Sequence, residues 1–353
     1  MEFYFDIEFI KELQNKTDNS DFYIDFVRFL KQLHGSNIYV FIEPSNNNED
    51  LLKNNLFLKY ISDSRPFISR NHTELTSVIE NKKTSGFKCF FINSLQSSNL
   101  RNEYGYFVLN SDEALNNSSL FDSGRQDLKK VTNERNGENY LNSWSVLKDY
   151  QFPINALVIN DRYLFNSENT LDINILSLIS NLGLKPLDNV KIDVAIITEE
   201  IFNLNQTDKN PTNEVLNKKF EIAFKVLAEH LNKLVGSENY NLSIIRVDRE
   251  TNPKASQLHY RILFTNFFVI NSEPSFSFFI RKNGNIIPRV KEDVNFDFLL
   301  WRRSIVSLEE KIKTIKEAFK NVNDQQNNNN IKLPPSFLKK RVLTNNRECR
   351  LLF

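Results

Sequence analysis

The chain has 353 residues, of which 40% are apolar and 25% are charged, and its 45 basic and 44 acidic side chains leave a net charge of +1. This length suffices for one large or two ordinary domains, and 30 Phe and 11 Tyr supply ample apolar surface for a core. The balanced charge excludes a global field that attracts nucleic acid or an anionic membrane, so any such surface has to be local.

Cysteine use and hydropathy narrow the class of protein further. Cys89 and Cys349 lie far apart, and neither has a Cys or His at metal-ligand spacing, which excludes a disulfide scaffold and a zinc ribbon. The N-terminus lacks the basic start and apolar stretch of a signal peptide, and no run approaches the roughly 20 apolar residues of a membrane span. We expect a cytoplasmic protein without a membrane span. Because P-loop, G-x-G-x-x-G, G-x-S-x-G and H-E-x-x-H motifs are missing, we expect no cofactor.

Residues 1–110 are predicted to form an N-terminal α/β domain. Apolar positions at three-to-four spacing indicate helices, and short runs of β-branched and aromatic residues indicate buried strands. The predicted elements are a helix over 22–33, a strand over 38–42, a helix over 75–79, and strands over 87–92 and 104–109. This alternation favours a sheet covered by helices.

Residues 111–150 are polar and rich in Asn, Ser and Asp, which is typical of a surface insertion or an interdomain linker. A segment that becomes ordered over a ligand is the alternative.

The alternation of strands and helices resumes in a second domain over residues 151–300. The predicted elements are strands over 156–159, 191–198 and 242–247, helices over 173–182 and 216–234, and strands over 258–264, 267–270 and 276–280. Strands joined in this order by helices favour parallel pairing. A C-terminal helix over 301–322 and an Asn-rich tether with a basic tail over 323–353 follow.

Three segments of the second domain carry a family resemblance. ALVINDRYLF, KIDVAIITEE and LHYRILFTN resemble, in this order, two strands and the H-x-K-x4-D element of the phospholipase D-like superfamily. The likeness covers residues 156–280 and is greatest to the divergent branch that carries a His-Asp-Arg signature or follows MIT domains. It implies an α/β fold with a mixed or parallel sheet flanked by helices. His259, Arg261 and Asn266 match the family's His, Lys and Asp.

In that family an imidazole attacks phosphorus, and a cation two residues later holds the phosphate oxygens. His259 and Arg261 have this spacing, and alternate side chains of a strand share a face. Asp161 and Arg162 end a predicted strand, where open α/β sheets place ligands. We therefore assign His259, Arg261 and Asp161 to catalysis. Arg162, Arg261 and Asn266 are assigned to phosphate binding. A structural Asp161–Arg162 cap and a purely structural His259 are the alternatives.

The sequence departs from the family pattern in ways that favour binding over turnover. Asn266 replaces a carboxylate, Tyr260 stands where the His-Asp-Arg branch has its acid, and the G-S-x-N element is missing. We expect a degenerate site that binds phosphodiesters, DNA or RNA, in a bacterial nucleic-acid-processing or antiviral defence complex. An active, metal-independent nuclease is the alternative. The family uses two histidines, so that alternative requires a homodimer. The other three histidines are assigned to helix surfaces or helix starts: His34, His72 and His230.

Two further hypotheses concern the ends of the chain. Asp6, Glu8, Glu43 and Asp112 lie at or beyond predicted strand ends, a pattern similar to metal-dependent PIN-like nucleases; ordinary solvated carboxylates are the alternative. Five of the six basic residues of the tail over 323–353 are assigned to contact with nucleic acid: Lys339, Lys340, Arg341, Arg347 and Arg350. Docking of a protein partner and a solvated end are the alternatives for this tail.

Overall fold

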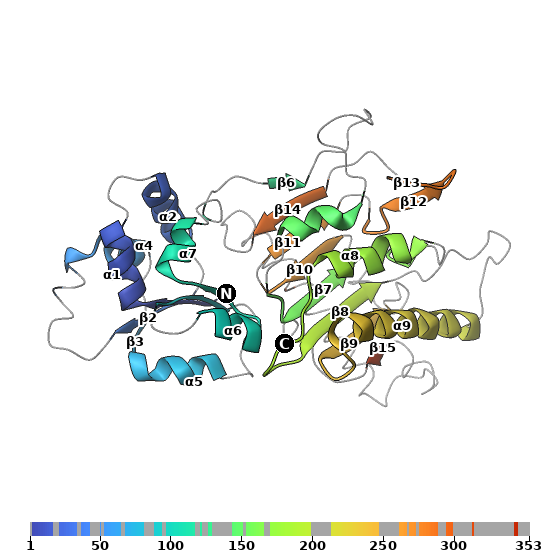
Figure 1. The fold of residues 1–353 in the computed structure, drawn as a ribbon, viewed down its shortest axis with the longest axis horizontal. Helices are drawn as coiled ribbons and strands as arrows, with labels where there is room; N and C mark the ends of the chain where they lie inside the picture. Colours follow the sequence, from blue (N-terminus) through green and yellow to red (C-terminus); the bar gives the residue numbers. More distant parts are fainter. Residues whose placement is uncertain are drawn as a thin grey trace.

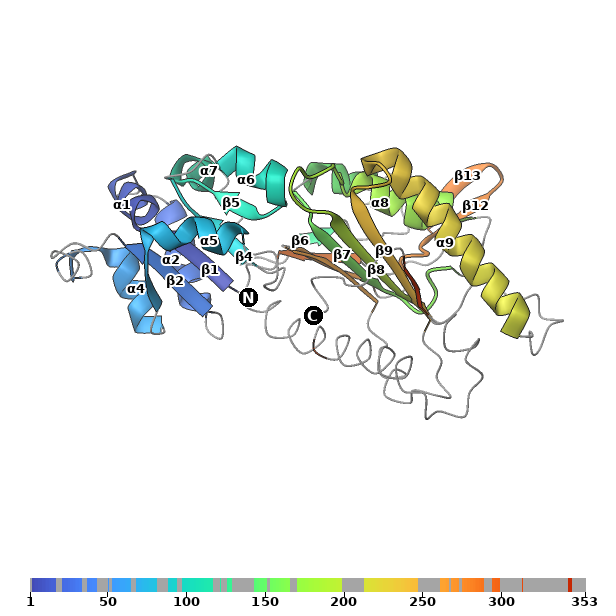
Figure 2. The same ribbon diagram turned by 90° about the horizontal axis from the view of Figure 1, so that it is seen from below.

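The structure is a computed structural model, shown as a ribbon in Figures 1 and 2. It describes residues 2–16, 21–33, 37–42, 50, 53–64, 68–80, 88–93, 97–116, 121, 126–128, 143–150, 153–165, 170–198, 213–246, 261–266, 268–272, 275–288, 294–298, 313 and 342–344. The described chain is mixed α/β and is built on a five-stranded and an eight-stranded sheet that lie side by side along the longest axis.

The first sheet is parallel throughout, with the strand order β3-β2-β1-β4-β5. Its strands are β1 (Glu2–Asp6), β2 (Asn37–Ile42), β3 (Ile68–Asn71), β4 (Lys88–Phe91) and β5 (Phe107–Leu109). The helices of this unit are α1 (Ile7–Lys16), α2 (Asp21–Gln32), α4 (Leu56–Ser64), α5 (Leu75–Glu80), α6 (Ser97–Tyr104), α7 (Ser111–Asn116) and the 3₁₀ helix η1 (His72–Glu74). Parallel strands need crossover connections, and the helices supply them.

Alternate residues of β1 fill two separate cores. Phe3 and Phe5 are buried among phenylalanines on one face, where the Phe5 ring stacks on Phe91 at 4.7 Å. Tyr4 points to the other face and stacks between Tyr39 and Phe90, with both centroid distances 4.9 Å. Burial on both faces is what parallel sheets require, and it explains the near-continuous aromatic runs of these strands.

The second sheet is mixed and has the order β15-β9-β8-β7-β10-β11-β14-β6. Its strands are β6 (Gln126–Leu128), β7 (Ala156–Asn160), β8 (Ile192–Thr198), β9 (Tyr240–Arg246), β10 (Ile262–Thr265), β11 (Phe268–Ser272), β14 (Val294–Phe298) and β15 (Val342–Thr344). β7, β8 and β9 are parallel, and the remaining pairs are antiparallel. The expectation of parallel pairing is therefore confirmed for three strands only, because β10 pairs antiparallel with β7 and with β11.

Helices cover one face of the second sheet. The helical elements of this unit are η3 (Trp144–Tyr150), the π-helix η5 (Asp172–Leu176), α8 (Ser177–Asn181) and α9 (Asn213–Val235). Successive parallel strands are added in one direction, so right-handed crossovers bring α8 and α9 to the same face, as Figures 1 and 2 show. A separate two-stranded sheet of β12 (Phe279–Lys282) and β13 (Asn285–Pro288) forms a hairpin beside this layer.

Two segments predicted to be peripheral contribute elements to the second unit. Trp144, at the end of the predicted insertion, is completely buried against Phe276, Phe278 and Phe279. β6 also comes from that insertion, and β15 comes from the predicted basic tail. Apart from Lys313, which is helical, the residues of the predicted C-terminal helix lie outside the described part.

The end of α6 joins the two units. Four successive carbonyls at this end accept hydrogen bonds from the second unit: Asn102 O from Asp188 N (3.3 Å), Glu103 O from Asn189 N (2.9 Å), Tyr104 O from Asn155 Nδ2 (2.9 Å) and Gly105 O from Asn266 Nδ2 (2.8 Å). The last carbonyls of a helix have no partner within the helix, so the second unit supplies the cap. Gly105 ends the helix at φ +62°, which is why the strand predicted from residue 104 begins only at Phe107.

Candidate functional site

The carboxyl ends of β7 and β8 form one edge of the second sheet. β7 ends at Asn160, which pairs with Ile262 of the antiparallel β10. Arg261, immediately before β10, therefore lies at the same edge as Asp161, immediately after β7. The opposite edge contacts α6 through Asn155, so this carboxyl edge lies away from the junction with the first unit.

Asp161 is fully buried at this edge, and both of its carboxylate oxygens accept hydrogen bonds. Oδ1 accepts from Tyr163 N at 2.9 Å, and Oδ2 accepts from Ser275 Oγ and Phe276 N, both at 2.6 Å. Burial raises the pKa of this carboxyl; the three hydrogen bonds and the Arg261 charge oppose that shift without cancelling it. Asp161 thus fixes the turn after β7 and the segment before β12, and these contacts support the structural alternative for it.

Two guanidinium groups contact a single aromatic ring beside Asp161. The Arg162 guanidinium carbon lies 4.9 Å from the centre of the Tyr163 ring, and that of Arg261 lies 5.5 Å from it. All three side chains are half-buried. The Arg162 carbonyl accepts a hydrogen bond from Thr198 Oγ1 at 3.3 Å, which links the turn to the end of β8. The structure thus brings together three of the predicted site residues, Asp161, Arg162 and Arg261.

This arrangement can bind an anion. The two guanidinium carbons lie within about 10 Å of each other, since both contact the same ring. Each guanidinium presents planar donors that match phosphate oxygens in bidentate geometry. Partial burial reduces solvent screening of both charges. The edge therefore offers two oriented cations.

His259, the predicted nucleophile, and Tyr260 lie outside the described residues. The spacing argument that places His259 on the same strand face as Arg261 stays a prediction. β10 itself begins after Arg261, at Ile262.

Asn266 lies at the other end of β10, and this corrects its assignment to phosphate binding. Its Oδ1 accepts from Asn155 N at 3.1 Å, while its Nδ2 donates to Gly105 O at 2.8 Å. Five residues of extended chain separate it from Arg261, roughly 16 Å at 3.3 Å per residue. Asn266 is completely buried in the junction between the units. Its side-chain amide therefore forms hydrogen bonds within the junction and does not reach a ligand at the carboxyl edge.

The described carboxylates that were predicted as metal ligands lie in two separate groups. Asp6, buried at the end of β1, accepts from Glu8 N at 3.2 Å and lies 3.7 Å from His72 Nε2. Asp112 is exposed and forms an ion pair with Lys16 at 2.9 Å. Glu43, which was also predicted as a metal ligand, lies outside the described residues. Within the described ranges, no three acidic, His or Cys side chains form a group that could hold a metal ion.

Two of the remaining histidines, His72 and His230, are described, and each lies where the sequence analysis predicts it. His72 opens the 3₁₀ helix η1, with Asn71 as its N-cap, as predicted. His230 is half-buried on α9, and its Nε2 lies 3.0 Å from the Leu176 carbonyl oxygen. His34 lies outside the described part, as do the five predicted tail cations.

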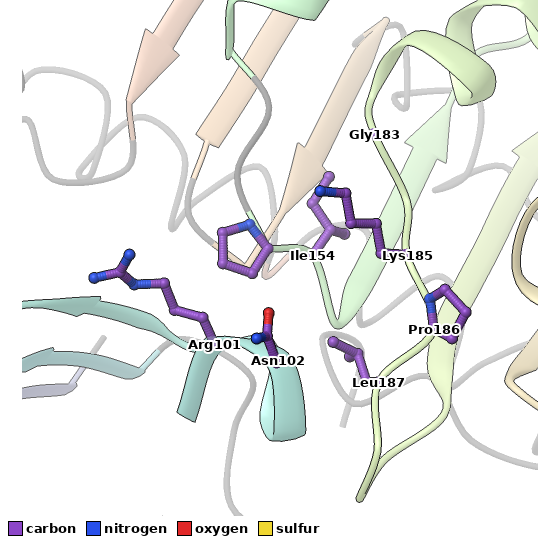
Figure 3. Close-up of a pocket in the computed structure, with 8 residues that line it drawn as sticks. Arg101, Asn102, Ile154, Gly183, Lys185, Pro186 and Leu187 are labelled. Carbon is purple, nitrogen blue, oxygen red and sulfur yellow. The ribbon is translucent and has the colours of Figure 1, made fainter. Parts of the chain in front are cut away.

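A pocket of roughly 150 Å³ lies at the junction of the units, as Figure 3 shows. The residues that line it come from α6, from the segment before β7 and from the segment after α8: Arg101, Asn102, Pro153, Ile154, Gly183, Lys185, Pro186 and Leu187. Ile154 precedes β7, so this pocket lies at the amino end of that strand. The pocket is therefore separate from the site at Arg261.

Two residues of the candidate site were given no role from the sequence. Tyr163, which contacts both guanidiniums, directly follows Asp161 and Arg162, so its position in D-R-Y was a usable signal. Ser275 adopts φ 141° and donates to Asp161 from a separation of 114 residues. No local pattern could have found that contact.

Searches against protein-family models and curated protein sequences find no match to this chain. In the part of the chain that the structure describes, no helix has the length and apolar character needed to cross a bilayer.

Proposed function

We propose that this protein binds the phosphodiester backbone of nucleic acid at the carboxyl edge of its second sheet, in a degenerate phospholipase D-like site. The observation that carries the proposal is the placement of the Arg162 and Arg261 guanidiniums against the same ring, that of Tyr163. Phosphate contacts dominate the affinity of proteins for nucleic acid, and arginine is a preferred donor for them.

The resemblance to the phospholipase D-like superfamily supports this proposal. That family uses a mixed or parallel sheet flanked by helices, and the second sheet is mixed with helices on one face. Arg261 stands where the family has its phosphate-binding cation, and it lies at the edge where open α/β sheets place ligands.

Binding without efficient turnover fits the other residues of the site. Asp161, the one carboxylate assigned to catalysis, already accepts three hydrogen bonds and is fully buried. It can orient the Arg261 charge but has no exposed oxygen that could take a proton from water. Asn266 is held in the junction. The described edge therefore contains cations to hold a phosphate and no accessible general base.

Replacement of Arg261 by alanine tests the proposal. We expect Arg261→Ala to weaken binding of single-stranded DNA or RNA by about tenfold to a hundredfold, because charge-assisted hydrogen bonds are lost. The slope of log K against log salt should become shallower by about 0.7 per lost phosphate contact on single strands. Fluorescence anisotropy titrations over a salt series measure both quantities.

The control is Arg28→Ala, which removes an arginine that pairs on the surface of α2 with Asp25. It changes the net charge equally and should leave affinity within about twofold. Equal affinities of the Arg261 and Arg28 variants would refute the proposal. Arg261→Lys should bind with intermediate affinity, because lysine keeps the charge but loses the planar donor pair.

A cleavage assay with the same protein distinguishes the two nuclease hypotheses, one metal-independent and one metal-dependent. Cleavage that persists in EDTA and disappears in His259→Ala would identify an active nuclease. Cleavage that needs Mn²⁺ and disappears in Asp6→Ala or Asp112→Ala would assign activity to the first unit.

Removal of the charges of the tail, from Lys339 to Arg350, tests by the same binding titrations whether that segment provides the affinity for nucleic acid instead of the carboxyl edge.

A further inference from the structure

The β12–β13 hairpin extends from the second unit as a separate two-stranded sheet. Asn283 and Gly284 form its turn at φ 52° and φ 77°, the pair of positive angles that a tight two-residue hairpin turn requires. Every residue from Arg281 to Ile286 is exposed. A two-stranded hairpin is at best marginally stable alone in water, so its base must be held by the rest of the unit.

Asn174 of the π-helix η5 holds the base of the hairpin. Its Oδ1 accepts from Phe279 N at 2.7 Å, and its Nδ2 donates to Phe279 O at 2.9 Å. Asn174 is 1% exposed, so these hydrogen bonds are shielded from water. Asp161 fixes the same segment three residues earlier, at Phe276 N. The hairpin is thus attached to the carboxylate that also lies beside Arg261.

Strand pairing separates the two faces of the hairpin. Arg281 lies opposite Ile286 on the face that carries the buried Phe279, and Arg281 forms an ion pair there with Asp172 of η5. Lys282 and Asn285 lie opposite each other on the alternate face. This second face presents a cation and an amide to solvent. Residues 279–288 contain no acidic residue, and with Arg281 paired to Asp172 the positive charge that this hairpin offers a ligand is that of Lys282.

We propose that the β12–β13 hairpin is a second nucleic-acid contact, through Lys282 and Asn285, for a strand whose phosphate lies at Arg162 and Arg261. This inference rests on the proposed function. Charge complementarity selects a polyanion, and both side chains are hydrogen-bond donors suited to phosphate and sugar oxygens. The hairpin tip, Asn283, is seven residues from Phe276, a reach of at most roughly 25 Å. That distance corresponds to about seven nucleotides of a helical strand at 3.4 Å each.

The test compares short and long oligonucleotides. Wild-type protein and Lys282→Glu are titrated with labelled single strands of about 4 and about 16 nucleotides at fixed salt. We expect Lys282→Glu to lose about fivefold to tenfold in affinity for the long strand and less than twofold for the short one, which cannot span both contacts. Asn285→Asp, on the same face, should reproduce the length dependence.

Lys218→Glu is the matched control, because Lys218 is exposed on α9 and its substitution changes net charge by the same amount. If Lys282→Glu and Lys218→Glu bind the long strand equally, the hairpin contact is refuted. Equal losses on both lengths would also overturn it, because they would make Lys282 part of the first contact. If Arg261→Ala still weakens binding in either case, the proposed function stands. Failure of wild-type protein to bind either strand would refute both.

Discussion

At the scale of single residues, burial decides what a functional group can do. Asp161 looks like a catalytic carboxylate at a strand end, yet its three hydrogen bonds make it the anchor for Tyr163 and Phe276. The arginines beside it keep partial exposure and therefore remain able to meet a ligand. Arg261 could be selected from its motif alone. Ser275 could not, because its contact with Asp161 depends on tertiary packing.

Burial also limits the reactivity of the Cys89 thiol. It lies fully buried in β4, and burial raises its pKa to about 12. At about pH 8 only about one thiol in ten thousand is then ionised, and the thiolate is the reactive form. We expect iodoacetamide to leave the Cys89 peptide unmodified in folded protein, as peptide mapping by mass spectrometry can measure. Unfolding in urea should make it fully reactive. Rapid alkylation in the folded protein would contradict the described packing.

At the scale of elements, hydrophobic patterning predicted the helices and strands whose own apolar residues recur at helix or strand spacing. The strand over 38–42, the helix over 75–79 and the long helix ending near residue 234 are confirmed. Short elements that bury few apolar side chains, such as β3 and α6, were missed because their largely polar sequences carry no hydrophobic pattern. Parallel or antiparallel pairing of the later strands also could not be predicted, since it depends on the connections between them.

The contact of α9 with the end of η5 is expected to depend on pH. Burial lowers the pKa of His230 below its ordinary value of 6.5; the hydrogen bond to the Leu176 carbonyl opposes that shift. The unfolded chain therefore binds a proton more readily than the folded chain, so stability should fall as pH drops below about 6.5. We expect His230→Gln, which can still donate to Leu176, to lose less unfolding free energy between about pH 7 and pH 5 than wild type. Urea unfolding at both pH values measures this difference. An identical pH dependence would contradict it.

At the scale of the whole molecule, the junction at α6 makes the two sheets structurally dependent on each other. Asn155 and Asn266 place their amides on the last carbonyls of that helix, and both side chains are fully buried. Composition divides the chain into two domains with a polar segment between them. It gives no sign of this shared cap, which is formed by asparagines that look like ordinary loop residues in sequence.

Gly105 provides the test of this junction. A Cβ there would lie 2.9 Å from Leu187 Cδ1 and 3.0 Å from Asn155 Cβ, whereas one on Gly284 would meet nothing within 4 Å. Both glycines have positive φ, so each alanine variant should lose about 1–2 kcal/mol of unfolding free energy from the backbone. Gly105→Ala should lose about 1–3 kcal/mol more, because it overpacks the junction. Chemical denaturation measures both. Equal losses would show that the junction accommodates a methyl group without strain.

The cap that the second unit provides for α6 also limits which fragments and chimaeras of this chain should be stable. A fragment ending near residue 110 would expose four peptide oxygens that the intact protein shields with amides from beyond residue 150, so its last helical turn should fray. If the second sheet were joined to a different N-terminal unit, the buried side-chain amides of Asn155 and Asn266 would lose the carbonyl acceptors at the end of α6. Separate expression of the halves is therefore expected to give two weakened proteins, and successful chimaeras should exchange the end of α6 together with residues 155, 188, 189 and 266.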